Sequence, residues 1–424
     1  MSHDLNSSDF LTQRRHPEPS ETGLCARDPF QRDRDRILHS RAFRRLMHKT
    51  QIFNANKGDH YRNRLTHTLE VSQIARSIGK VLHLNDELIE AIALGHDLGH
   101  TPFGHIGERT LNDILSGKTS DTYLKNLPET SRGFKHNFQS LRMVDELETR
   151  CPDYKGINLA FAVREGILKH TGLQKNGSLV AYPENDYSHM NLELPFSFTY
   201  EGQVVAIADE IAQATHDLED AVRSKIVSFD EVAHNILVRQ IIEKRVIRIP
   251  NDTSKGLSPS YDVRTLIIKN MVGYFIEDVC FTSQKKISDY ENKYHPDFSS
   301  QNNCIKEKCI SLSDDIEQAR KEMYDEVIKN NILSSEEISI SDSKSEYIIS
   351  HLFKAYHAHP KQLPDYVLKR YYDQKDREFV RTNINDVELK EDPIFLRAIC
   401  DHIAGMTDQF AAREYNRLYL PEYT

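Results

Sequence analysis

Apolar residues recur at helical spacing along most of the chain, and the clearest case spans residues 63–82. Its apolar positions are three or four residues apart, as on the buried face of a helix; they are Val71, Ile74, Ile78 and Val81. His67 lies four residues before Val71, so its imidazole falls on the same face. The pattern predicts a helix that carries a histidine on its buried side.

A second helix is expected directly after the first. Asn85 and Asp86 are suitable N-terminal caps, and Gly99 is a residue at which a helix commonly stops. Between them, one face carries Ile89, Ile92, Ala93 and then His96. Two buried helical faces are therefore expected to converge on histidines.

A third helix is predicted over residues 202–225, with a line of polar residues on one face. The line has spacings of three or four residues and consists of Asp209, Gln213, Asp217 and Asp220. In a helical bundle such a line either faces water or lines a polar pocket. Apolar residues flank Asp209 closely on both sides, which favours the pocket.

The overall pattern predicts an all-α, mostly helical fold without internal repeats. Residues 1–26 are expected to form a flexible arm, 27–245 a helical core, and 246–424 a helical C-terminal region with a polar accessory segment at 283–346. An irregular stretch over residues 173–201 is compatible with short strands or a lid. A chain of 424 residues is long enough to bury a substantial core.

Composition adds few constraints, since 38% hydrophobic and 28% charged residues are ordinary values for a soluble protein. No apolar run approaches the roughly 18 residues that a membrane span needs, and the N-terminus lacks the apolar segment of a signal peptide. The six cysteines form no C-x-x-C pair, which suits a reducing compartment. A cytoplasmic location is expected.

The net charge of −9 argues against a general nucleic-acid-binding protein. The charge is uneven, however, because residues 27–49 contain eight lysines and arginines against three acids. A strongly anionic small ligand would explain this basic stretch. A solvated helix face with internal salt bridges is the alternative, because Asp33 and Asp35 alternate with arginines.

His96 and Asp97 are adjacent, so an imidazole and a carboxylate can bind one cation together. His67 and Asp209, on the two other predicted helices, complete a set of four ligands. These ligand types suit divalent Mg, Mn, Co, Fe, Ni or Zn and leave positions open for water and phosphate oxygen. One histidine on an apolar face is usually a core residue, but the combination favours a metal-dependent phosphohydrolase.

Downstream of this pair, His105 and Glu108 lie three residues apart on a helix expected to begin near Pro102. Glu108 can then orient the His105 ring and raise its pKa, which would make the two a catalytic acid–base pair. The alternative is an ordinary first helical turn with an acid near the helix dipole.

Other polar residues are candidates for contact with phosphate or sugar. Arg64 lies three residues before His67 on the same face, and Lys169 precedes a histidine and a threonine. A surface cation is the alternative for both. His136 and Asn137 offer hydrogen-bond donors, with turn capping as the alternative.

With these residues assembled, the chain resembles the deoxyguanosine triphosphate triphosphohydrolase family within the HD-domain superfamily. Besides the four metal-ligand candidates, the resemblance is carried by residues 28–46, 49–53, 133–142, 209–221 and 403–408. The strong part covers residues 28 to 245, and the C-terminal region is similar to a lesser degree.

The resemblance implies an HD-domain bundle that hydrolyses a deoxynucleoside triphosphate at the α-phosphate, releasing the deoxynucleoside and inorganic triphosphate. It implies metal binding by His67, His96, Asp97 and Asp209, and catalysis by His105 with Glu108. Substrate contacts are implied for Gln51, Arg64, Lys169 and Asp217; the full set of substrate-binding candidates adds His100, His136, Asn137 and Gln213. Gln213 departs from the family pattern, since many relatives have a tyrosine there that packs on the deoxyribose.

Family members are commonly homo-oligomers, and some bind single-stranded DNA or are activated by deoxynucleotides. The acidic net charge gives DNA binding no support. Two other interpretations stay open: HD chemistry on another nucleotide (a monophosphate, cyclic nucleotide or guanosine polyphosphate), or a non-hydrolysing nucleotide sensor or DNA-binding regulator. The basic N-terminal segment weighs against the first, and the complete set of metal and catalytic candidates weighs against the second. The base preference and the native metal stay open.

Overall fold

The computed structural model describes residues 5–18, 27–51, 62–118, 133–175, 178–179, 190, 192, 194–224, 226–245 and 261–421. Helices dominate these residues, and the strands named among them are one antiparallel pair of two residues each, β1 (Gln174–Lys175) and β2 (Ser178–Leu179). The prediction of an all-α fold is confirmed. No helix within the described ranges combines the length and the apolar character needed to cross a bilayer.

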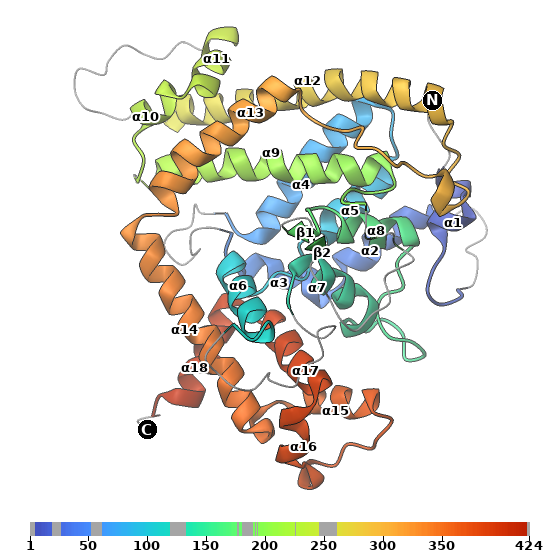
Figure 1. Cartoon of the computed structure of the whole chain (residues 1–424), viewed down its shortest axis with the longest axis vertical. Helices are drawn as coiled ribbons and strands as arrows, with labels where there is room; N and C mark the ends of the chain where they lie inside the picture. Colours follow the sequence, from blue (N-terminus) through green and yellow to red (C-terminus); the bar gives the residue numbers. More distant parts are fainter. Residues whose placement is uncertain are drawn as a thin grey trace.

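The helices are shown in Figure 1. In chain order they are α1 (Asp9–Thr12), α2 (Pro29–Leu38), α3 (Arg41–Arg45), α4 (Arg64–Val81), α5 (Asp86–Gly95), α6 (Gly104–Leu115), α7 (His136–Arg142), α8 (Phe161–Leu168), α9 (Tyr200–Arg223), α10 (Phe229–His234), α11 (Ile236–Lys244), α12 (Tyr261–Tyr294), α13 (Asp314–Met323), α14 (Glu336–Ala358), α15 (Asp365–Gln374), α16 (Asp386–Glu391), α17 (Pro393–Ala404) and α18 (Asp408–Tyr419).

Helix α4 begins where its sequence predicts, because the Asn63 side chain accepts a hydrogen bond from the Thr66 amide. His67 and three of the four predicted apolar residues are buried on its inner face. Val81 was expected there too, but it is 55% exposed. It is the last residue of α4, so the apolar face ends one turn before the helix does.

Helix α5 is capped by Asn85 as expected, and it ends at Gly95, four residues before the predicted stop at Gly99. His96 and Asp97 therefore lie in the turn that follows the helix. Gly99 has a different role, because a Cβ atom at this position would lie 2.1 Å from the Ser140 amide nitrogen. The missing side chain allows α7 to approach this turn closely.

The third predicted helix is α9, displaced by two residues from its expected bounds. It packs against α4, α5, α8 and α12, and Figure 1 shows it running through the upper half of the molecule next to α4. This packing turns Asp209 toward the histidines of α4 and of the turn after α5.

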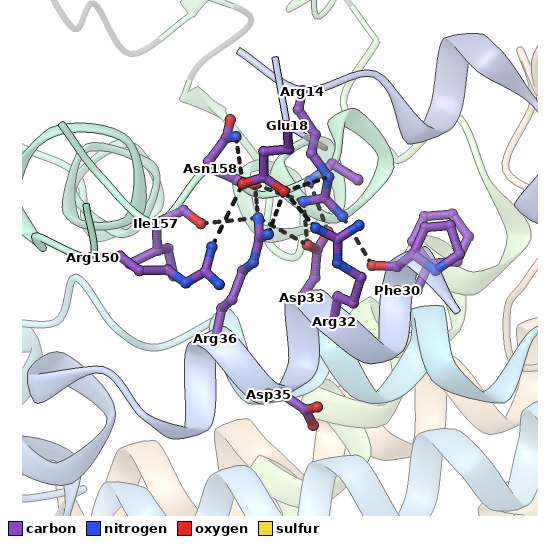
Figure 2. Close-up of polar contacts among 12 residues, drawn as sticks. Arg14, Glu18, Phe30, Arg32, Asp33, Asp35, Arg36, Arg150, Ile157 and Asn158 are labelled. Carbon is purple, nitrogen blue, oxygen red and sulfur yellow. Dashed lines mark hydrogen bonds and ion pairs between the residues drawn. The ribbon is translucent and has the colours of Figure 1, made fainter. Parts of the chain in front are cut away.

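The prediction of a flexible N-terminal arm is wrong for residues 5–18. Leu5 and Leu11 are buried in the main hydrophobic core, and the Phe161 amide donates to the Gln13 carbonyl oxygen at 2.8 Å. The two buried leucines and the hydrogen bonds from Arg14 to the carbonyl oxygens of Asn158 and Pro29 anchor this short, mostly polar segment; Figure 2 shows Arg14 with Asn158 and the Glu18 carboxylate. Residues 1–4 and 19–26 lie outside the described residues.

The described residues form two hydrophobic clusters. The first joins α4, α5, α8 and α9 to α12 and α13, so buried residues on both sides of the predicted boundary at 245/246 share one core. The second contains the C-terminal helices and the inner face of α6. In Figure 1, α14 runs from the α13 end of the molecule down to these C-terminal helices. The domain boundaries stay a prediction, and the segment 283–346, expected to be polar, also buries Cys304, Ile305 and Ile310.

Candidate metal and phosphate site

Four predicted metal ligands meet between α4, α9 and the turn after α5. His67 Nε2 lies 2.9 Å from Asp209 Oδ1. His96 Nε2 lies 3.4 Å from Asp97 Oδ1 and 3.8 Å from Asp209 Oδ1. The ligand atoms of His67, His96 and Asp97 are all within 4.8 Å of one another, and all three residues are buried. The structure thus brings together side chains separated by up to 142 positions.

The tautomer of His96 is set by the preceding helix. Its Nδ1 donates to the Ala93 carbonyl oxygen at 2.6 Å. In the tautomer whose proton lies on Nδ1, Nε2 presents a lone pair. This nitrogen is buried and has no hydrogen-bond partner among the described residues. It faces the carboxylates of Asp97 and Asp209, which are acceptors as well.

His67 is oriented by two residues that the sequence analysis did not select, His216 on α9 and Glu70 on α4. His216 Nε2 lies 2.6 Å from Glu70 Oε2, and its Nδ1 lies 3.3 Å from His67 Nδ1. Burial raises the pKa of Glu70, but the hydrogen bond from His216 and the charge of Arg62 bring it down to about 2. Burial lowers the pKa of His216 to about 4, so its ring is neutral.

These protonation states define the direction of each hydrogen bond. His216 donates through Nε2 to the Glu70 carboxylate, so its Nδ1 accepts from His67 Nδ1. In the neutral tautomer of His67 that donates through Nδ1, Nε2 presents a lone pair to the Asp209 carboxylate across 2.9 Å. Two acceptors at this distance repel each other unless a cation lies beside both. For bonds of about 2.0–2.2 Å, neighbouring ligands of one divalent ion lie about 2.9–3.5 Å apart, so these residues fit a metal ion.

Arg64 lies next to this cluster and is almost completely buried. Its Nη1 donates to Asp97 Oδ2 at 2.8 Å, while Nε and Nη2 have no hydrogen-bond partner among the described residues. Gln51 Oε1 and His100 Nδ1 are also buried without a described partner. Buried polar groups normally find partners, so this set points to a polar ligand. The structure therefore brings predicted substrate-binding residues to the four metal-ligand candidates.

The expected pair of His105 and Glu108 does not form a hydrogen bond among the described contacts. Glu108 Oε2 lies 2.5 Å from His136 Nδ1 instead, because α7 brings His136 against the inner face of α6. The His105 ring is accessible to solvent. The surrounding protein and the charge of Arg64 lower its pKa to about 4, and Glu108 offsets this only in part. The predicted rise in the His105 pKa is therefore wrong.

His170 is a further residue that the sequence analysis missed. Its Nδ1 lies 2.7 Å from the Ile167 carbonyl oxygen and its Nε2 lies 3.2 Å from His136 Nε2. His136 stacks on His100 with ring centroids 3.9 Å apart, and His100 Nε2 lies 3.1 Å from Asp97 Oδ1. The histidines thus form a continuous wall beside the metal-ligand candidates.

Two predicted substrate-binding residues have partners within the protein instead of an open binding position, and their contact with substrate stays a prediction. Lys169 pairs with Glu165 at 3.1 Å and lies over the Phe198 ring, so its charge is already compensated in the core. Asn137 donates to the Leu168 carbonyl oxygen at 2.9 Å and is completely buried. Both residues fix the end of α8. The histidine after Lys169, not the lysine, faces the cluster.

Gln213 and Asp217 follow Asp209 along α9. Gln213 is half-buried, whereas Asp217 is buried and its Oδ2 has no described hydrogen-bond partner. Burial, followed by the charges of Asp220 and Asp209, raises the pKa of Asp217 well above its usual value. Protonation is therefore easier at Asp217 than at a free carboxyl group, and a protonated carboxyl can donate a hydrogen bond.

The C-terminal region holds the loops around the site. Asp408 accepts hydrogen bonds from the Thr50 amide at 2.8 Å and from the Phe103 amide at 2.9 Å. Lys49 Nζ donates to the carbonyl oxygens of His100 and Ala404. These contacts connect the start of α18 to the segments before α4 and before α6. No local sequence pattern indicates this connection.

The geometry agrees with comparisons to known proteins. An HD domain model matches residues 64–214 and a phosphohydrolase-associated domain model matches residues 310–417. Similar curated proteins carry the name deoxyguanosinetriphosphate triphosphohydrolase-like protein. One from Rickettsia bellii is 37% identical over 392 residues, covering 92% of each chain. Another from Brucella ovis is 34% identical over 420 residues, covering 97% of this chain and 93% of the relative.

A third relative, deoxyguanosinetriphosphate triphosphohydrolase-like protein 1 from Mesorhizobium japonicum, is 36% identical over 406 residues, covering 93% of this chain and 89% of the relative. The HD domain match contains all four metal-ligand candidates, and the phosphohydrolase-associated match contains Asp408. The similarity thus extends over both the site and the region that holds it. The chain belongs to the deoxyguanosinetriphosphate triphosphohydrolase-like family of HD-domain phosphohydrolases.

Proposed function

We propose that this protein is a metal-dependent deoxynucleoside triphosphate triphosphohydrolase. The reaction adds one water molecule to the α-phosphorus and breaks its bond to the 5′ oxygen. The water oxygen stays on inorganic triphosphate, and a proton goes to the leaving deoxynucleoside. The names of the similar proteins and the composition of the histidine cluster support this reaction.

The observation that carries the proposal is the position of Arg64 beside the metal-ligand candidates. Its guanidinium is anchored on Asp97, and its buried Nε and Nη2 have no hydrogen-bond partner in the part of the chain that the structure describes. A polyphosphate satisfies such donors, and Arg is well suited to phosphate oxygens because its donors form a planar fork. A cluster of carboxylates and histidines alone would suit many ligands, whereas the positive charge of Arg64 favours an anionic ligand.

His67, His96, Asp97 and Asp209 are the proposed metal ligands. When bound, a divalent ion supplies charge stabilisation at the reacting phosphoryl group. Arg64 then holds phosphate oxygens, and His105, the accessible histidine with a pKa of about 4, acts on the attacking water as a neutral base. Asp217, whose buried Oδ2 has no hydrogen-bond partner among the described residues, is the proposed contact to the sugar.

The test is a product analysis with the four deoxynucleoside triphosphates and Mg, Mn or Co, each alone and in mixtures. Inorganic triphosphate and deoxynucleoside are expected in equal amounts, and reaction in ¹⁸O-labelled water should place the label in triphosphate. His105→Ala is the comparison variant and is expected to lose turnover while it keeps nucleotide binding. Release of only pyrophosphate or orthophosphate from every substrate would contradict the proposal, as would label in the deoxynucleoside.

The contact between Glu70 and His216 gives an independent test of the metal site. Glu70→Gln removes the carboxylate that fixes the His216 tautomer, so the His67 ring is no longer held with its Nε2 lone pair toward the metal. Loss of such a supporting partner typically lowers metal affinity by about 10–100-fold. The expected change is a loss in this range, measured by competition with a chelating dye.

Glu219→Gln is the matched control for this substitution. Glu219 also accepts a hydrogen bond from Arg62, but it does not contact His216 in the described structure. The metal affinity of the Glu219→Gln variant is expected to equal that of the unmodified protein. Equal metal affinities of the Glu70→Gln and Glu219→Gln variants would show that the contact between Glu70 and His216 does not support metal binding.

A further inference from the structure

Residues 403–408, which join the end of α17 to the start of α18, have no role in the chemistry described so far. They lie against the segment that precedes α4. Arg45 Nη1 donates to the Gly405 carbonyl oxygen at 2.6 Å, and Lys49 Nζ donates to the Ala404 carbonyl oxygen at 2.8 Å. The C-terminal region therefore reaches the immediate surroundings of the metal and phosphate site.

The last residue of this segment, Asp408, is buried and binds two other segments at once. Its Oδ2 accepts from the Thr50 amide at 2.8 Å, and its Oδ1 accepts from the Phe103 amide at 2.9 Å. Thr50 is followed by Gln51, and Phe103 is the N-cap of α6, the helix that carries His105. One carboxylate thus sets the separation between the segment with Gln51 and the start of α6.

The turn at Phe103 and Gly104 needs support from outside. Both residues have left-handed backbone conformations, with φ angles of 61° and 60°. A phenylalanine rarely adopts this conformation, and such strain persists only where the surrounding structure holds it. Here the hydrogen bond to Asp408 holds the Phe103 amide, and the Phe103 side chain packs against the C-terminal hydrophobic cluster. Both supports come from the C-terminal region.

The same turn lies against the phosphate site. A Cβ atom at Gly104 would lie 3.2 Å from Arg64 Nη2 and 3.3 Å from the Gln51 carbonyl oxygen. Arg64 Nη2 is one of the two buried guanidinium nitrogens that have no hydrogen-bond partner among the described residues. His105 is the next residue after Gly104, so a displacement of this turn would move His105 relative to Arg64 and Gln51.

We propose that Asp408 is a positioning residue for the reaction, which holds Gln51 and His105 at a fixed separation across the ligand site. The C-terminal region thereby contributes to turnover without contacting the substrate. The inference rests on the proposed function, because that function assigns the substrate to Gln51 and the attacking water to His105. A carboxylate suits this role, since both of its oxygens accept hydrogen bonds, whereas an amide side chain offers one accepting and one donating group.

Asp408→Asn is the test, because the new side chain can accept from only one of the two backbone amides. We expect kcat to fall by about 10–100-fold, since a displacement of about 1 Å at a reacting group can have an effect of this size. KM should change by less than about threefold. Metal affinity and metal stoichiometry, measured with a chelating dye, should equal those of the unmodified protein, which shows that the variant is fully folded.

Hydrogen exchange, followed by mass spectrometry of the full chain, measures the two segments directly. In Asp408→Asn, the backbone amides of Thr50 and Phe103 are expected to exchange at least about tenfold faster. Asp392→Asn is the matched control, with the same change in charge and a lost acceptor for the Ile394 amide at the start of α17. Asp392 contacts neither segment in the described structure, so kcat and both exchange rates should stay unchanged.

Four results would overturn the inference: an unchanged kcat in Asp408→Asn, an equal loss of kcat in Asp392→Asn, a fall in kcat matched by an equal fall in metal stoichiometry, or unchanged exchange of both amides. The third result would show partial unfolding instead of a positioning role. If the unmodified protein hydrolyses no deoxynucleoside triphosphate, the proposed reaction is wrong. The exchange rates of the two variants then still decide whether Asp408 holds the two segments.

Discussion

Replacing Asp209 by Asn is expected to remove the bound divalent ion and to lower kcat/KM by about 10³-fold or more, since a metal site that loses an anionic ligand loses both affinity and charge stabilisation. The two side chains have nearly the same shape, so α9 should keep its packing. The amide group loses the negative charge that faces His67 Nε2 at 2.9 Å. Metal content by mass spectrometry and turnover of the deoxynucleoside triphosphates measure the two effects separately.

Glu210→Gln is the matched control for Asp209→Asn. Glu210 is the next residue on α9, and its carboxylate pairs with Arg320 at 2.9 Å, away from the histidines. The change in net charge is the same, so general electrostatic effects are equal in the two variants. Metal content and turnover should stay at the level of the unmodified protein. An Asp209 variant that retained both properties would contradict the assignment of Asp209 as a metal ligand.

The residues of the site that could be predicted from the sequence are those that belong to local sequence patterns. His67 and Asp209 lie on helical faces whose periodicity is visible, and His96 is adjacent to Asp97. Because these faces are hydrophobic, they pack toward the core of the helical bundle. The side chains of His67 and Asp209 are thereby expected to meet. The N-terminal cap Asn85 was also predicted, because capping depends on the few residues at the start of a helix.

The residues that were missed or misplaced depend on packing between segments. Glu108 was paired with His105 on its own helix, but α7 brings His136 to Glu108 from 28 positions away. Lys169 was selected as a cation, while the adjacent His170 faces the cluster, because the local sequence does not define which neighbour turns inward at the end of α8. His216 had a usable signal, since it lies seven residues after Asp209 and so two turns along the same face.

The connection between the C-terminal region and the core had no local signal at all. Asp401 on α17 accepts two hydrogen bonds from Arg142 Nε, at 3.0 and 2.9 Å, and one from its Nη2 at 2.7 Å. Gln139 on α7 donates to the same carboxylate at 3.0 Å. These partners are separated by about 260 positions and are all buried. This pair therefore fixes α17 against the helix that carries His136.

Removing only the arginine of this pair is expected to destabilise the protein by about 3–5 kcal/mol, because the Asp401 carboxylate then stays buried without the charge of Arg142. Arg142→Met is the variant, since methionine fills much of the same volume without the charge. The free energy of unfolding, measured by urea denaturation at neutral pH, should fall by this amount. Arg76→Met is the control, because its salt bridge with Asp86 is about half exposed and such pairs contribute about 0–1 kcal/mol.

A double variant tests whether the unpaired charge causes the loss. Arg142→Met/Asp401→Leu removes both charges, so neither is left buried without a partner, and it is expected to be more stable than Arg142→Met alone. The same variants report on the site, since α7 carries His136 and any shift should alter its contact with Glu108. A loss below about 1 kcal/mol in Arg142→Met, or a double variant as unstable as the sum of the two single changes, would show that the pair does not hold the C-terminal region in place.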